Sequence, residues 1–184
     1  MKKLVIVIGM MSLTFAQSSG MSLYGGLNYA NMSYEDVEYK ASPSYLLGVQ
    51  KNMGSFLLGV GISGRGAKMD YPMLDELGSS GTIETTLKFT YLDVHAMKTF
   101  PAGPGALFAA LGIGVNLSAK MEVLGIEADI EDVGLDYGVN LGYSFPLNEK
   151  MSIFASYYLG LAPINDSSDS PTHNGIGLGI GYGL

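Results

Sequence analysis

The most regular feature of the chain is an alternation of apolar with small or polar residues that continues from residue 17 to the C-terminus. In residues 175–184, five apolar side chains alternate with five glycines. Residues 106–120 and 133–145 alternate in the same way. A period of two residues places the apolar side chains on one face of a β-strand and the others on the opposite face. The pattern therefore predicts an all-β protein.

Eight segments carry this alternation and predict eight strands. They cover approximately residues 22–33, 44–52, 56–65, 81–100, 106–120, 133–145, 152–161 and 175–184. In the fourth segment the alternation changes phase near Tyr91 and Leu92, which predicts a β-bulge at this point.

The predicted connections are alternately short and long. Residues 53–55, 101–105 and 146–150 are short, whereas residues 34–43, 72–80, 121–132 and 162–174 are longer and polar. Transmembrane β-barrels have short periplasmic turns and longer external loops. Because eight is an even number, we expect both ends of the barrel on the periplasmic side.

The residues that alternate with the apolar ones are mostly Gly, Ser and Ala. A strand face in water carries long charged side chains, whereas the interior of a narrow barrel has room for small ones. Aromatic residues near the strand ends suit membrane interfaces; they are Phe56, Tyr143, Phe145 and Tyr182. An open sheet edge in lipid leaves unpaired backbone groups, so the sheet must close. We predict an eight-stranded antiparallel up-and-down transmembrane β-barrel. The alternative is a soluble barrel whose apolar face encloses a ligand.

The first residues have the pattern of a secretory signal peptide. Lys2 and Lys3 precede an apolar stretch at residues 4–16, which is too short to span a bilayer comfortably. The small residues Thr14 and Ala16 predict cleavage before Gln17. We expect a cleaved signal peptide at residues 1–16 and an outer-membrane barrel domain at residues 17–184. The chain has no Cys, so we expect neither disulfides nor an acylated cysteine.

The chain is acidic, and the acidic residues concentrate in the predicted long loops. Without the leader it has 8 basic and 17 acidic residues, which argues against nucleic-acid binding. Of the acidic residues, 13 fall in or beside the long loops. The densest cluster contains Glu127, Asp129, Glu131 and Asp132. Oxygen ligands suit Ca²⁺ or Mg²⁺, so these four are candidate cation ligands, within the loop or bridging to lipopolysaccharide phosphates. The alternative is ordinary solvation of exposed loops.

Several ionisable residues fall on the predicted inner face of the barrel. They are Arg65, Glu84, Lys88, Asp93, His95, Lys120 and Asp136. Charges inside so narrow a barrel usually pair and fill it. The alternative is a narrow channel, because strands lined with glycine leave extra room.

Two combinations raise the question of catalysis. His95 lies two residues from Asp93, so both side chains can share one face and form a hydrogen-bonded pair. His173 lies in the predicted last loop, near Ser170 and two further serines. Neither combination supplies a recognisable nucleophile, base and orienting group, so we expect no enzymatic activity and no cofactor.

The C-terminal strand has the pattern of an assembly signal. Outer-membrane barrels usually end with Gly, a hydrophobic residue and a terminal aromatic residue at set positions, which here hold Gly179, Tyr182 and Leu184. We expect the barrel-assembly machinery to bind this strand. Leu184 departs from the usual Phe.

Several segments resemble the outer-membrane β-barrel domain family, often labelled "porin family protein". Residues 23–32 are similar to its first strand and residues 64–68 to the end of its third. Residues 87–98 are similar to its fourth strand, with His95 where Pro is usual, and residues 155–161 to a later one, with Ser156 in place of Arg. The resemblance implies a small Gram-negative outer-membrane barrel that contacts lipid and lipopolysaccharide, with no shared catalytic residues. We expect a structural or interaction scaffold with acidic external loops; the alternative is a narrow channel or small-solute pore.

Overall fold

The computed structural model describes residues 20–34, 37–74, 80–165 and 170–184, so the predicted signal peptide lies outside the described residues. Nine strands in this part of the chain form one antiparallel sheet. They are β1 (Met21–Ser33), β2 (Lys40–Asn52), β3 (Leu57–Leu74), β4 (Ser80–Ala102), β5 (Gly105–Val123), β6 (Ile126–Asp129), β7 (Asp136–Pro146), β8 (Met151–Pro163) and β9 (Thr172–Gly183). Within the same ranges, no helix is both long and apolar enough to cross a membrane.

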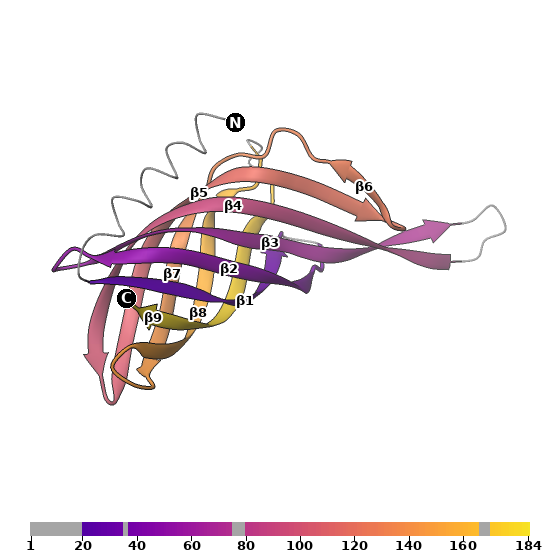
Figure 1. The fold of residues 1–184 in the computed structure, drawn as a ribbon. Helices are drawn as coiled ribbons and strands as arrows, with labels where there is room; N and C mark the ends of the chain where they lie inside the picture. Colours follow the sequence, from indigo (N-terminus) through magenta and orange to yellow (C-terminus); the bar gives the residue numbers. More distant parts are fainter. Residues whose placement is uncertain (1–19, 35–36, 75–79, 166–169) are drawn as a thin grey trace.

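Eight of these strands close into a ring (Figure 1). Each pairs with its neighbour along the chain, β5 pairs with β7, and β1 pairs with β9 to complete the circle. The closing register runs from Ser22 opposite Gly183 to Ser33 opposite Thr172. Closure pairs the backbone groups that an open sheet would leave exposed. The prediction of an eight-stranded up-and-down barrel is confirmed. The extra strand, β6, pairs with the end of β5 outside the ring.

The short and long connections lie at opposite rims, as predicted. At the rim of the short turns, the backbone amide of Asn52 donates to the carbonyl of Gly20 at 2.8 Å. The backbone amide of Gly183 donates to the carbonyl of Lys150 at 2.7 Å. Both described ends of the chain therefore lie at this rim.

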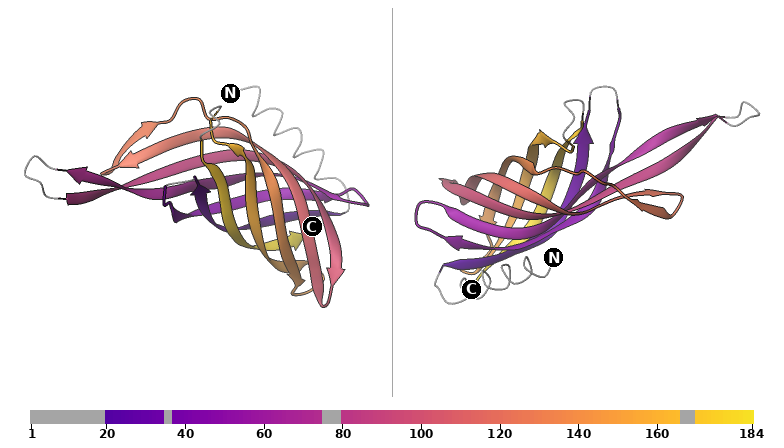
Figure 2. Two further views of the ribbon diagram at one scale, coloured as in Figure 1. Left: turned by 180° about the vertical axis from the view of Figure 1, so that it is seen from behind. Right: turned by 90° about the horizontal axis from the view of Figure 1, so that it is seen from above.

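At the opposite rim, two of the predicted loops are partly strand. The range 72–80 contains the ends of β3 and β4, and the range 121–132 contains β6. Pairing of β2 with β3 ends at Lys40 and Lys68, but pairing of β3 with β4 continues to Leu74 and Ser80. We call residues 69–74, 80–86, 120–123 and 126–129 the protruding sheet, because they extend beyond the ring (Figures 1 and 2).

The apolar face of the strands points out of the barrel. Its large exposed residues occur all around the ring and include Leu27, Leu47, Ile62, Val94, Leu111, Leu141, Leu159 and Ile176. Leu111, for example, is 68% exposed. The soluble-barrel alternative, with the apolar face inside, is therefore wrong. On β7, the exposed rings of Tyr137 and Phe145 are eight residues apart. At about 3.3 Å per residue and a tilt of roughly 40°, they bracket about 20 Å, close to the apolar band of outer-membrane barrels.

Aromatic rings fill part of the interior by lying over glycines of neighbouring strands. A Cβ atom added at either Gly48 or Gly61, which are cross-strand partners, would collide with the ring of Tyr24. Phe108 lies over Gly142 in the same way, and Phe154 lies over Gly179. The glycine-rich inner face is therefore partly occupied by rings that larger residues would exclude.

A bulge is present at the predicted place in the pairing of β4 with β5. The extra residue, however, lies on β5 and not on β4. Pairing of β4 with β5 shifts between Thr90 and Tyr91, where Leu117 of β5 has no partner on β4. The side-chain amide of Asn116 donates to the carbonyl of Ser118 across this bulge at 3.3 Å. On β4 itself the odd-numbered residues face inward throughout. The apparent change of phase in the sequence arises because Leu87, Phe89 and Tyr91 are both apolar and inward-facing.

Candidate functional site

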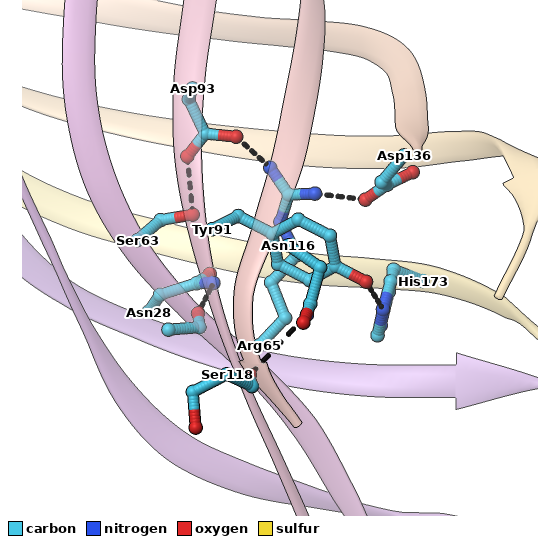
Figure 3. Close-up of polar contacts among 10 residues, drawn as sticks. Asn28, Ser63, Arg65, Tyr91, Asp93, Asn116, Ser118, Asp136 and His173 are labelled. Carbon is cyan, nitrogen blue, oxygen red and sulfur yellow. Dashed lines mark hydrogen bonds and ion pairs between the residues drawn. The ribbon is translucent and has the colours of Figure 1, made fainter. Parts of the chain in front are cut away.

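A buried ion-pair layer crosses the interior of the barrel (Figure 3). Arg65 of β3 donates through Nη2 to Asp93 of β4 and through Nη1 to Asp136 of β7. The hydroxyl of Ser63 donates to the second carboxylate oxygen of Asp93. Arg65 is 9% exposed and Asp136 is 3% exposed, so the layer is almost removed from solvent. Charges can stay buried there because they are paired.

The strand register explains how three distant residues meet. Asp93, Gly114 and Asp136 are successive cross-strand partners on β4, β5 and β7. A Cβ atom at Gly114 would stand 2.8 Å from Asp93 Oδ1 and 3.1 Å from Arg65 Nη1. The glycine between the two carboxylates therefore leaves the space that the guanidinium occupies.

Aromatic rings enclose the guanidinium. Arg65 Cζ lies 4.5 Å from the ring centroid of Tyr91 and 4.7 Å from that of Tyr158, both within cation–π range. The hydroxyl of Tyr91 lies 3.2 Å from Nε2 of His173, whose imidazole also packs edge-on against Phe89. These rings continue into a buried apolar cluster toward the rim of the long loops, made of Met32, Ala67, Leu87, Phe89, Tyr91, Ala119 and Ile164. This half of the interior is filled.

On the other side of the ion-pair layer, the interior is hollow. A cavity of about 320 Å³ extends from Arg65 and Asp93 toward the rim of the short turns. Its lining combines aromatic rings, such as Phe108 and Phe154, with hydroxyl and amide side chains. The amide oxygen of Asn140, on the same lining, is buried and has no hydrogen-bond partner.

The seven predicted lumen residues divide into two groups. Arg65, Asp93, His95 and Asp136 face the interior. Glu84, Lys88 and Lys120 instead lie on the outer face, with side chains that are 52%, 49% and 41% exposed. Their assignment to the lumen is a correction that the structure makes. Glu84 and Lys88 are even-numbered on a strand whose odd residues face inward. Lys120 is turned outward by the bulge at Leu117.

These three residues belong to a set of outward ion pairs near the rim of the long loops. Lys40 contacts Asp70 at 2.6 Å, Lys68 contacts Glu84 at 2.6 Å, and Lys120 contacts Glu127 at 2.7 Å. Lys88 contacts both Glu122 and Glu127. The pairs join β2, β3, β4, β5 and β6 in sequence. Each is exposed, so each contributes little to stability individually.

Glu127, a candidate cation ligand, forms ion pairs with two lysines. Hydrogen bonds from Lys120 and Lys88 lower the pKa of its carboxyl below the usual value, and the bond to Glu127 raises the pKa of Lys120. In the described ranges, no three His, Asp or Glu side chains gather closely enough to hold a metal ion. The structure therefore does not bring Glu127, Asp129, Glu131 and Asp132 together as a cation site.

The two histidines are not arranged as catalytic pairs. Asp93 binds Arg65 and Ser63, while the ring of His95 packs edge-on against Tyr24 with centroids 5.7 Å apart. His173 is not in a loop but on β9, where it is 1% exposed. Residues 166–169, which include two of the serines near it in sequence, lie outside the described residues.

Sequence reasoning missed the aromatic part of the layer. Its members are Tyr91, Tyr158 and His173. The sequence did contain a signal for His173. The inner face of the final strand is made of odd-numbered residues, and His173 is the next odd-numbered residue before Gly175. No comparable signal identified Tyr91, since an apolar ring on an inner face resembles a residue of the outer face.

Comparisons with known proteins agree with this architecture. The chain matches the model of the outer membrane protein beta-barrel domain over residues 4–183. No curated protein matches it in sequence.

Solved structures share the fold at low identity. Neisserial surface protein A has a TM-score of 0.67 and 13% identity, over 90% of this chain and 98% of its own. Ail of Yersinia pestis, solved with a heparin analogue, has a TM-score of 0.53 and 18% identity, over 91% and 100%. OprG of Pseudomonas aeruginosa has a TM-score of 0.50 and 10% identity, over 90% and 96%. The expected family is confirmed: the chain belongs to the outer membrane protein beta-barrel domain family and is a small β-barrel of the outer membrane.

Proposed function

We propose that the protein is a closed outer-membrane scaffold that presents the protruding sheet and the acidic loops at the cell surface. The observation that carries this proposal is the ion-pair layer of Arg65, Asp93 and Asp136, which joins three strands across the interior. The buried apolar cluster adds a second barrier on the external side. A barrel filled in this way acts as an anchor for the part of the chain that projects from the membrane.

The projecting part has its own structural support. Residues 69–74 of β3 pair with residues 80–85 of β4, and β6 widens the sheet beside β5. The outward ion pairs join these strands without help from the bilayer. Most acidic residues of the chain fall in or beside the long loops, so the presented surface favours basic partners or surfaces. We assign no catalytic step to the barrel, because Asp93 is bound to Arg65 rather than orienting His95.

The competing function is a narrow channel. The cavity that extends toward the short turns favours it, because part of the interior is hollow. Planar-bilayer recording of the refolded protein tests it directly. We expect no stepwise conductance, because an ion would have to pass the Arg65 layer and the apolar cluster. Stable conductance steps from pure protein would overturn the closed-scaffold proposal.

Presentation is tested by shortening the protruding sheet. Lys68 and Thr86 are cross-strand partners, so replacing residues 69–85 with Asn-Gly joins them by a two-residue hairpin turn. We expect the variant to fold, giving a heat-modifiable band in the outer membrane, and cells displaying it to adhere less to a polylysine-coated surface. The double substitution Asp70→Asn with Glu84→Gln keeps the protruding sheet but removes two of its carboxylates. It therefore shows how much of the adhesion depends on charge rather than on the presence of the sheet. Unchanged adhesion of the shortened variant would contradict the proposal.

We also propose that the lysines of the outward ion pairs lie near lipopolysaccharide phosphates. They are exposed on the lipid-facing side of β2 to β5, just beyond the apolar band. Replacing Lys68, Lys88 and Lys120 together with Gln should then lower folding yield in liposomes containing lipopolysaccharide, but not in phosphatidylcholine alone. Lys98→Gln, near the rim of the short turns, is the matched control. Equal yields in both liposomes would exclude this contact.

A further inference from the structure

The interior cavity has the size of a small-molecule site and is reachable from one side. Its volume of about 320 Å³ is at the lower end of the range for ligand pockets. Ala106, Ser144 and Ser152 on its lining lie within a few residues of the short turns. The ion-pair layer limits it at the other end. A solute would therefore enter from the periplasm and stop at Arg65 and Asp93.

The cavity exists because small residues occupy inner positions that could hold larger ones. An added Cβ at Gly112 would stand 3.7 Å from its nearest atoms, which is ordinary van der Waals contact, so this lining position has room for a methyl group. At Gly177 and Gly181, an added Cβ would meet the hydroxyl oxygens of Ser156 and Ser152, respectively, at 2.8 Å. The same strands hold bulky rings elsewhere in the interior. The hollow is therefore local and is bounded by packed residues.

The lining favours an organic cation. The ion-pair layer contains one guanidinium and two carboxylates, so it retains one excess negative charge when the histidines are neutral. Asp93 lines the cavity and accepts one hydrogen bond at each carboxylate oxygen, from Arg65 and Ser63. Each oxygen has capacity for a further donor.

Two other features suit the same class of ligand. An ammonium group supplies three donors and no acceptor, which matches the remaining acceptor capacity of the Asp93 carboxylate. Tyr24 and Phe154 line the cavity, and aromatic rings attract a cation and pack against an aromatic body. A negatively charged solute would gain from neither feature and would be repelled by the excess negative charge.

We propose that this cavity binds a small organic ammonium compound with an apolar or aromatic body, taken from the periplasmic side. Such a site is independent of whether the protruding sheet binds a partner. Its ligand class follows from the excess carboxylate, the remaining acceptor capacity of Asp93 and the aromatic lining.

Three probes with one aromatic scaffold and different charges test the assignment. They are tyramine, which is a cation, 4-ethylphenol, which is neutral, and 3-(4-hydroxyphenyl)propionate, which is an anion. Binding to the full refolded barrel in nanodiscs is measured by saturation-transfer NMR and calorimetry. We expect tyramine to bind roughly tenfold more tightly than the anion, which corresponds to about 1.4 kcal/mol.

Variants separate the cavity from the lipid around it. Gly112→Leu should fill the hollow and weaken tyramine binding at least about tenfold, whereas Leu111→Phe, its lipid-facing neighbour, should leave binding unchanged. Asp93→Asn should remove the preference for the cation while retaining the aromatic contacts. A heat-modifiable band establishes that each variant is folded, and Ser156→Phe serves as a second filling variant.

Two results would overturn the assignment. Equal binding of all three probes that neither filling variant reduces would show partitioning into lipid only. Tighter binding of the anion than of tyramine would show that Arg65, rather than Asp93, sets the charge preference of the cavity.

Discussion

Replacing Arg65 with Met should destabilise the barrel more than any single surface substitution. The change removes the only cation of the described ion-pair layer and keeps a side chain of similar length. Asp93 and Asp136 then face each other across Gly114 without a countercharge. Asp136 is 3% exposed, so solvent does not replace the partner that it loses, whereas Asp93 meets solvent through the cavity.

The expected cost is about 4 kcal/mol. Removing one member of a buried ion pair typically costs about 3–5 kcal/mol, because an uncompensated charge remains. Loss of the two cation–π contacts, at 4.5 and 4.7 Å, contributes about 1 kcal/mol or more, and protonation of one carboxylate returns part of the total. A loss of 4 kcal/mol changes the unfolding equilibrium by about three orders of magnitude. The free energy lost in Arg65→Lys should be smaller than in Arg65→Met but still measurable. A single ammonium group cannot replace a guanidinium whose two terminal nitrogens bind two carboxylates.

The free energy of unfolding is measured by urea titration of the protein in lipid vesicles. Far-UV circular dichroism and gel mobility without boiling give two independent probes. The matched control is the triple variant Arg65→Met, Asp93→Asn and Asp136→Asn, which removes every charge of the layer. It should lie within about 2 kcal/mol of the wild type, since a neutral replacement of a buried ion pair is often tolerated.

The reasoning fails on either of two results. The first is a loss below about 1 kcal/mol for Arg65→Met, which would mean that the layer is hydrated and screened. The second is a triple variant no more stable than the single one, which would mean that packing of the Arg65 stem, and not its charge, supports the barrel.

Three further predictions follow from other parts of the barrel. Gly26→Ala should cost about 2 kcal/mol or more in urea unfolding, because its Cβ would collide with the β9 backbone at Leu178, whereas Gly112→Ala should change stability by less than about 0.5 kcal/mol. The lowered pKa of Glu127 means that its contribution to the β5–β6 hairpin is present above the usual Glu pKa and is lost as the pH falls through the lowered one. The protection of the β6 amides, relative to their intrinsic exchange rate at each pH, should therefore fall in that acidic range while the ring amides stay protected. Leu184→Phe should speed assembly into the outer membrane in pulse-chase fractionation, and an unchanged rate would argue against recognition of the terminal residue.

The sequence alone predicted the barrel because its evidence is local. Alternation from Gly175 to Leu184 fixes which face of a strand is apolar, and the small residues between fix which face can be enclosed. Once the strands are counted, closure follows from the cost of unpaired backbone groups in lipid. The inward positions of Arg65 and Asp136 also follow from alternation, since no bulge separates either residue from the apolar pattern that predicted its face.

Tertiary structure decided what depends on pairing between strands. A single unpaired residue, Leu117, reverses the faces of the rest of β5, and its effect on Lys120 is invisible in a strict period of two. In the sequence, the apolar inner face around Phe89 has the same pattern as a lipid-facing face. Only the closed ring shows that it points inward. Arg65, Asp93 and Asp136 come together only through the register of β3, β4, β5 and β7, which is set by hydrogen bonds between segments far apart in sequence. Sequence thus determined each strand's faces, while closure of the ring determined which inner residues meet.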